Sequence, residues 1–148
     1  MENKEKELQF QMRISSVNVL RFSQYDIEDF DPNKFDAIEY QSDYGVKVLP
    51  DSSEIAVETT LKLKVQELDS YFGELKVLMK FQITPFDNII KKVDDEFQIP
   101  DLLIFNLFNI LTGTLRGILY EKLRGTILQN EVLPLIDIKD LMKAKKVK

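Results

Sequence analysis

The stretch Glu54–Val65 reads EIAVETTLKLKV and contains the clearest pattern in the chain. Apolar residues or threonine stand at every odd-numbered position from Ile55 to Val65, and mostly charged or polar residues stand between them. Because successive side chains of a β-strand point to opposite faces, this alternation predicts a strand with one buried face and one solvated face.

The same alternation returns after the turn residues Leu68-Asp69-Ser70. Apolar side chains then occupy every second position from Leu75 to Ile83, with lysine, glutamate and glutamine among the residues between them. The two stretches predict an antiparallel hairpin. Lysines and glutamates that face each other on the solvated side would help to fix its register.

Two further strands are expected before this hairpin. Residues 8–22 alternate, but the apolar parity changes at Ser15-Ser16, which predicts a long strand with a β-bulge. Residues 25–39 are acidic and aromatic and contain Pro32, so we expect a loop or an irregular crossing segment. Residues 44–49 predict a shorter strand that stops at Pro50.

The C-terminal third has helical spacing. Pro100-Asp101 suits the start of a helix that runs to about Leu123, with Gly125 just beyond its end. The first half of this helix is apolar nearly all round, so one sheet could cover only one of its sides and a second copy of the chain is the simplest cover for the other. The residues assigned to this oligomer contact are Leu103, Leu107, Ile110, Gly113 and Gly117.

The order of elements predicts the fold class. A last short helix is expected from Pro134 to about Ala144. Strands followed by helices predict an α+β fold, a four-stranded antiparallel sheet with a long and a short C-terminal helix on one face. We expect one domain over residues 1–148, with residues 1–6 and 144–148 flexible.

Composition argues against an enzyme. The chain has no histidine and no cysteine, and its five glycines are scattered, so the common nucleophile systems, Cys/His metal sites and Gly-rich phosphate loops are excluded. Asp29, Asp31 and Asn33 have the spacing of a calcium loop, but its later positions are wrong. The cluster Asp94–Glu96 is interpreted as solvated or capping a helix. The sequence predicts no catalytic residue, no metal and no cofactor.

Charge and hydropathy restrict the partners. The net charge is −5 although lysines crowd the last residues, so the body is more acidic still and nucleic-acid binding is not expected. The charged start has no apolar stretch of a secretory signal, and the longest apolar stretch is short for a bilayer. We therefore expect a cytoplasmic protein without direct membrane insertion.

Residues 22–44 are rich in aromatic side chains that lie beside acidic residues or proline. Two interpretations stay open: the aromatics complete the core at the edge of the sheet, or they line an adaptable apolar groove. They are Phe22, Tyr25, Phe30, Phe35, Tyr40 and Tyr44.

Several short motifs carry a family resemblance. They are Phe10-Gln11-Met12-Arg13-Ile14, Asn109-Ile110-Leu111, Arg116, Arg124-Gly125-Thr126, and Pro134 leading into Ile138 and Leu141. In their order and spacing they resemble SecB, the tetrameric export chaperone.

The resemblance implies a function as well as a fold. It implies an ATP-independent holdase that binds unfolded or nascent polypeptides in apolar grooves, and a dimer of dimers in which the long helices pack together. The aromatic residues Phe22, Tyr25, Phe30, Phe35 and Tyr44 would form the groove wall. The rest of the groove would come from Val46, Val48, Leu49, Ile83, Ile138 and Leu141.

The chain also departs from the family pattern. SecB binds the translocase motor SecA through acidic residues on the outer face of its sheet, whereas residues 17–22 here contain no acid. Lysines replace the acidic tail of the family. These differences argue against SecA as a partner, so protein export and service to antitoxins are both kept as predictions. The alternative is a homo-oligomeric binding module for one dedicated protein partner or a small apolar ligand.

Overall fold

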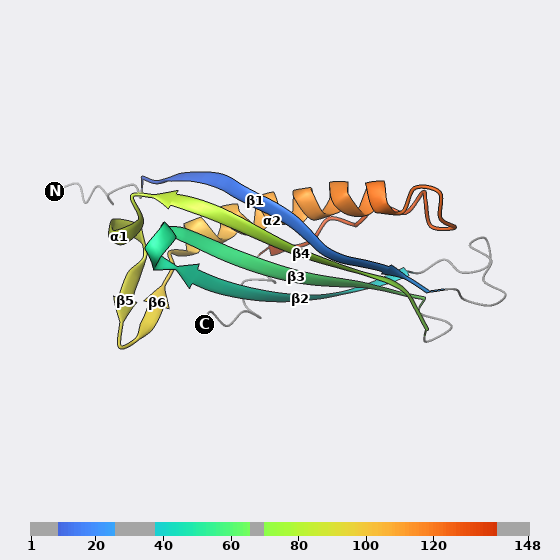
Figure 1. Ribbon diagram of the computed structural model, residues 1–148, viewed down its shortest axis with the longest axis horizontal. Coiled ribbons are helices and arrows are strands. Elements are labelled where there is room, and N and C mark those ends of the chain that lie inside the picture. Colours follow the sequence, from blue (N-terminus) through green and yellow to red (C-terminus); the bar gives the residue numbers. More distant parts are fainter. Residues whose placement is uncertain (1–8, 26–37, 66–69, 139–148) are drawn as a thin grey trace.

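The computed structural model describes residues 9–25, 38–65 and 70–138. Four antiparallel strands form one sheet in the order β1-β4-β3-β2, and a long helix lies on one of its faces (Figure 1). This confirms the predicted α+β class. The bounds are β1 Gln11–Gln24, β2 Ile38–Leu49, the 3₁₀ turn η1 Pro50–Ser52, β3 Glu54–Val65, β4 Ser70–Thr84, α1 Phe86–Ile89, β5 Lys91–Val93, β6 Glu96–Gln98 and α2 Asp101–Lys122.

The predicted hairpin is the centre of the sheet. Leu61 of β3 pairs with Leu75 of β4, and Val57 pairs with Met79, so the apolar positions of both strands share one face. These side chains are buried under α2, and we call this the inner face. On the opposite, outer face Lys62 stands across from Glu74, as the charge pattern predicts.

The bulge in β1 is confirmed. The register shifts between Ile14 and Ser16, so the change of parity keeps Val17 on the same face as Ile14. A second irregularity, which the sequence did not indicate, falls between Val19 and Arg21. Two extra residues therefore keep the apolar side chains of β1 on the inner face along its whole length.

Two segments differ from the expectation. β2 begins at Ile38 and not at residue 44, because backbone pairing with β3 continues through the polar residues that hid it. The sequence predicts no helix or strand over residues 86–98, yet these residues form α1 and the β5–β6 hairpin. Asp94 and Asp95 make the turn of that hairpin, with φ of 51° and 64°, so the acidic cluster caps no helix.

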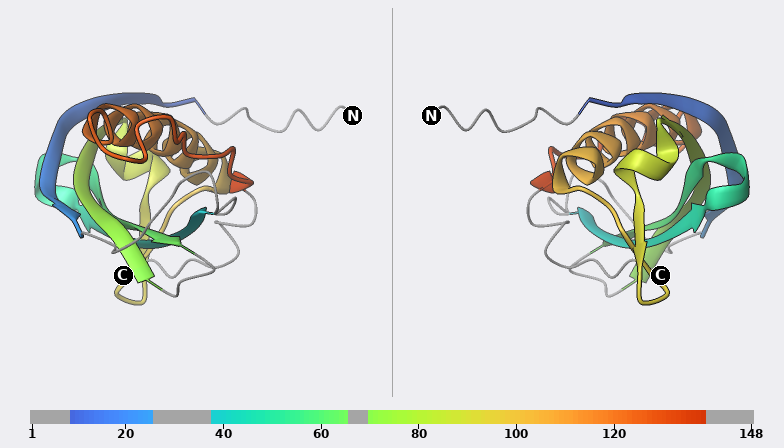
Figure 2. Two further views of the ribbon diagram at one scale, coloured as in Figure 1. Left: turned by 90° about the vertical axis from the view of Figure 1, so that its right-hand side faces the viewer. Right: turned by 90° about the vertical axis from the view of Figure 1, so that its left-hand side faces the viewer.

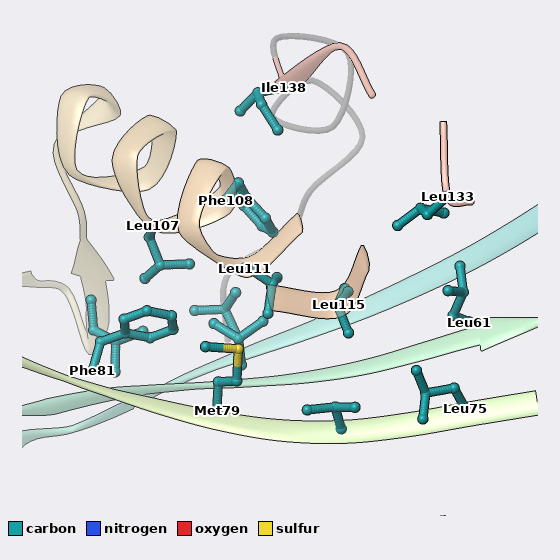
Figure 3. Packing of buried hydrophobic residues seen from close by; sticks show 14 of the residues in the cluster. Leu61, Leu75, Met79, Phe81, Leu107, Phe108, Leu111, Leu115, Leu133 and Ile138 are labelled. Atoms are coloured by element: carbon teal, nitrogen blue, oxygen red, sulfur yellow. The ribbon is translucent and has the colours of Figure 1, made fainter. Parts of the chain in front are cut away.

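One row of α2 makes the contact with the sheet. Leucine recurs at every fourth position, an i, i+4 ridge that is inclined to the helix axis. The strands curve around this side of α2 (Figure 2). Leu107, Leu111 and Leu115 point toward the sheet residues in Figure 3. The buried members of the ridge are Leu103, Leu107, Leu111, Leu115, Leu119 and Leu123.

The helix expected from Pro134 does not begin there, because residues 131–137 have no regular secondary structure and Ile138 is the first helical residue of this segment. The Arg116 side chain donates to the carbonyls of Leu133 and Pro134, at 2.9 and 3.3 Å. These carbonyls are thus bonded to α2 and not within a helical turn. The remainder of the predicted helix, with Leu141, lies outside the described residues.

The close approach of β1 to Gly73 of β4 gives a stability prediction. A Cβ on Gly73 would lie 2.7 Å from the Ser23 carbonyl oxygen, whereas a Cβ on Gly45 meets nothing within 4 Å. Gly73→Ala must therefore displace β1, and we expect it to lower the free energy of unfolding by about 1–3 kcal/mol. Gly45→Ala is the matched control, with a change within about 0.5 kcal/mol. Urea denaturation measures both; equal effects would contradict the packing described at β1.

Candidate functional site

A groove of about 860 Å³ runs along β2. The groove residues that come from β3 and β4 alternate along each strand with residues of the core. The groove therefore opens on the outer face of the sheet. Its lining residues are Asp43, Tyr44, Gly45, Val46, Lys47, Leu49, Ala56, Glu58, Thr60, Leu78 and Lys80.

Small residues create this groove. Gly45 pairs with Glu58 and contributes no side chain, and the neighbouring pair is Lys47 with Ala56. Ala56 is also paired with Lys80 on its other side. Small residues between longer ones leave a hollow whose floor is Ala56 with Leu78 beside it. Long lysine stems and Glu58 form the walls.

The carboxylates of β3 and β4 on the outer face have partners. Lys76 pairs with Glu58 at 2.9 Å, and Arg21 pairs with Glu74 at 2.7 Å. Hydrogen bonds from Ser15 and Ser52, with a smaller contribution from the charge of Lys80, hold the pKa of Glu54 below its usual value. The carboxylates of β3 and β4 on this face are therefore engaged.

The inner side of β2 is closed. The ring of Tyr44 meets the ring of Phe108 edge to face, with centroids 5.4 Å apart. Val46 and Val48 are buried in the same core cluster as Phe108 and Ile138, both of which Figure 3 labels. The C-terminal segment thus covers the seam between β2 and α2.

A second hydrogen bond holds that segment to β2. The Tyr40 hydroxyl donates to Oε1 of Glu131 at 2.5 Å. Burial, followed by the hydrogen bond and the negative charge of Glu131, raises the pKa of Tyr40 far above 10. Burial also raises the pKa of Tyr44. Both phenols stay neutral in the folded protein.

The predicted groove residues separate into groups. Leu49 lines the groove on the outer face. Tyr44 and Val46 border the groove, but their side chains face the closed inner side, where Val48 and Ile138 are buried. The remaining predicted residues are not brought to β2: Ile83 and Phe22 lie on β4 and β1, and Tyr25 is exposed after β1; Phe30, Phe35 and Leu141 lie outside the described residues.

Sequence reasoning missed the floor of the groove. Gly45, Ala56 and Leu78 stand at positions that the alternation assigns to the solvated face. A small or apolar residue at such a position is the signal that could have indicated them, because charged residues are usual there.

Apolar surface remains exposed at the other edge of the sheet. Ile14, Val17 and Val19 of β1 are each more than 40% exposed although their partners on β4 are buried. On α2, the side away from the leucine ridge is also exposed. It presents Leu102, Phe105, Ile110, Gly113, Gly117 and Tyr120.

The residues assigned to an oligomer contact need a correction. Leu103 and Leu107 belong to the leucine ridge and are already buried against the sheet of the same chain. Ile110, Gly113 and Gly117 lie on the exposed side of α2 and are free for an intermolecular contact.

Neither a metal site nor a membrane-spanning role is needed to explain the described residues. Over the described ranges, no group of three or more His, Cys, Asp or Glu side chains could hold a metal ion. By length and composition α2 would be long enough to cross a membrane. That resemblance is weak evidence, because the buried ridge of α2 is explained by the sheet on which it packs.

Comparison with known proteins gives a likeness of fold. No family model and no curated protein sequence matches the chain. A solved SecB-like chaperone of Mycobacterium tuberculosis, in complex with a ChAD peptide from the HigA1 antitoxin, superposes with a TM-score of 0.62 at 14% identity. The match covers 84% of this chain and 90% of that chain. This chain therefore has the fold of a SecB-like chaperone.

The Tyr40–Glu131 contact predicts a pH dependence. Because the pKa of Tyr40 is raised, the folded protein keeps a proton that the unfolded chain loses above pH 10, so the free energy of unfolding falls as the pH rises further. Tyr40→Phe should show a shallower fall between pH 10 and about 11 in urea titrations. Tyr120→Phe, at a half-exposed position of α2, is the control and should follow the wild type. Identical slopes for all three proteins would refute this role of Tyr40.

Proposed function

We propose that this protein is an ATP-independent holdase that binds extended apolar segments of unfolded or nascent polypeptides in the groove along β2. The observation that carries the proposal is this groove of about 860 Å³ with its apolar floor, on the fold of a SecB-like chaperone. A groove of this kind is suited to binding a polypeptide through the edge of the sheet and through apolar contacts, and not to catalysing a reaction.

The position of the groove suits an extended ligand. β2 is an edge strand, because the sheet order places β3 on one side of it and no described strand on the other. An extended polypeptide can add to such an edge through its backbone and place alternate side chains in an adjacent hollow. Backbone pairing accepts many sequences, which is the property that a holdase needs.

Composition supports a passive binding cycle. The described part of the chain offers no glycine-rich phosphate cradle, so release of the client would depend on competition and not on nucleotide hydrolysis. A net charge of −5 favours solubility while apolar surface is exposed. We place the protein in the cytoplasm and treat it as neither an enzyme nor a nucleic-acid-binding protein.

The antitoxin peptide on the structural neighbour favours service to antitoxins as the client class. Protein export is the second candidate role, and it would require SecA as a partner. The outer face of the sheet argues against SecA, because its cationic residues outnumber its acidic ones. These residues are Arg13, Arg21, Lys47, Lys62, Lys64, Lys76 and Lys80 against Glu39, Asp43, Glu54, Glu58 and Glu74.

We further propose that the active form is a dimer of dimers. The exposed apolar side chains of β1 and of α2 form the surface that a second copy would cover. Gly113 and Gly117 would let a partner helix approach α2 closely, because neither has a side chain to hold it away.

The holdase proposal is tested by aggregation of two unrelated unfolded proteins without nucleotide. We expect the wild type to suppress both, and Leu78→Asp in the groove floor to need about tenfold more protein for the same effect, since a buried carboxylate opposes apolar binding. Leu135→Asp, at a position 92% exposed, is the matched control and should act like the wild type. Suppression of neither client would contradict the proposal; selective binding of one partner would favour a dedicated binding module.

Self-association is tested by light scattering. We expect a mass well above the 17.3 kDa of one chain, and a shift toward it in the double variant Val17→Asp/Ile110→Asp, because both charges would be buried in the contact. Leu135→Asp should keep the wild-type mass. A wild-type protein that stays at the mass of one chain would contradict the dimer of dimers but not the groove.

A further inference from the structure

Two lysines stand on either side of the groove floor. Lys47 of β2 and Lys80 of β4 are both paired with Ala56 of β3. Neighbouring strands lie about 4.8 Å apart, so the two backbones are separated by roughly 10 Å with only a methyl group between them. Long, flexible stems let both ammonium groups approach one ligand group placed above Ala56.

These two lysines are in no ion pair among the described residues, and only Lys80 acts on a nearby acid, through a minor charge effect on the pKa of Glu54. By contrast, Lys76 pairs with Glu58. Lys62 and Lys64 of the same face lie 5.6 and 6.0 Å from the ring centroid of Tyr71. The nearby carboxylate of Glu54 accepts a hydrogen bond from Ser15.

Apolar surface lies directly beside this charge. Ala56 lies between the two lysines, and Leu49 and Leu78 line the groove on either side of this row. Asp43 lies four residues from Lys47 along β2, about 13 Å at the usual rise of a strand. The two lysines therefore stand beside apolar lining residues and away from Asp43, while the carboxylate of Glu58, which also lines the groove, is paired with Lys76.

We propose that the groove prefers client segments in which an acidic side chain is flanked by apolar residues. The carboxylate lies between Lys47 and Lys80, and its apolar neighbours lie on Ala56 and Leu78. This inference rests on the proposed polypeptide binding and specifies its substrate class. The acidic character of the whole chain does not oppose it, because charges more than about 8–10 Å away are screened at physiological salt.

Other anionic ligands fit the site less well. Pockets for small molecules bury about 70–90% of the ligand surface, and this groove is open along the outer face. A fatty acid would also leave the edge of β2 unused, whereas a polypeptide can pair with it. A second copy could offer its own acidic turn at Asp94–Glu96, so the test includes self-association.

The experiment uses fluorescence anisotropy with full-length protein and labelled peptides of about twelve residues, roughly 40 Å when extended. The peptides share their apolar residues and differ by carrying glutamate, glutamine or lysine between them. We expect the glutamate peptide to bind at least about tenfold more tightly than the lysine peptide, with a preference that weakens as salt is added.

Charge reversal identifies the residues responsible. Lys47→Glu/Lys80→Glu should invert the preference, and Lys47→Gln/Lys80→Gln should abolish it while keeping side-chain size. Lys91→Glu/Lys92→Glu on β5 makes the same change of charge away from the groove and should retain the wild-type preference. Circular dichroism checks that each variant is folded, and the glutamine variant decides the matter if charge reversal prevents folding.

The outcomes separate this inference from the proposed function. Equal binding of all the peptides, unchanged in the Lys47/Lys80 variants, overturns the acidic preference and leaves polypeptide binding intact. Failure of every peptide to bind overturns both. Binding of palmitate that is lost in the Lys47/Lys80 variants, while no peptide binds, would assign the groove to a small amphiphile. Loss of self-association in the lysine variants, with peptide affinity unchanged, would assign it to a second copy.

Discussion

The contact between the leucine ridge of α2 and the inner face of β3 and β4 is the interaction on which the rest of the structure depends. Burying one leucine side chain contributes about 1.5–3 kcal/mol, and the ridge presents a leucine to the core at every fourth position from Leu103 to Leu123. An i, i+4 ridge is inclined to the helix axis, so it can follow a sheet that curves (Figure 2). Once this ridge is docked, the opposite side of the same apolar helix must face outward.

With the leucine ridge packed on the sheet, one edge of the sheet is covered by another segment and the other edge is exposed. On the β2 side the C-terminal segment, bonded through Arg116 and Glu131, covers the seam between sheet and helix. On the β1 side no described segment covers Val17 and Val19, which stay exposed beside buried partners. The β2 edge is therefore closed within the chain and presents its groove on the outer face, while the β1 edge presents exposed apolar surface.

The sequence predicted what depends on periodicity. The central hairpin, the bulge at Ser15 and the long helix all follow from spacing that one strand or helix imposes on its own residues. The length of β2 and the groove floor depend instead on neighbouring strands. Residues 38–43 are too polar to be recognised as a strand without their pairing to β3. Ala56 is recognised as the groove floor only when Lys47 and Lys80 are known to stand on either side of it. Arg116 illustrates the same limit, because its role depends on carbonyls far along the chain that it holds out of a helix.

Charge shows most clearly why a local property cannot be read from a total. A net charge of −5 suggests a surface that repels acidic ligands. The distribution is uneven, however, because the fold pairs Glu58 and Glu74 with Lys76 and Arg21, whereas Lys47 and Lys80 form no salt bridge with the described residues. Two unit charges about 4 Å apart at a protein surface interact with a gross energy of about 4 kcal/mol before desolvation, whereas distant charges are screened by salt. The ligand chemistry of the groove is therefore decided by the few charges that the fold does not pair, and not by the sum over the chain.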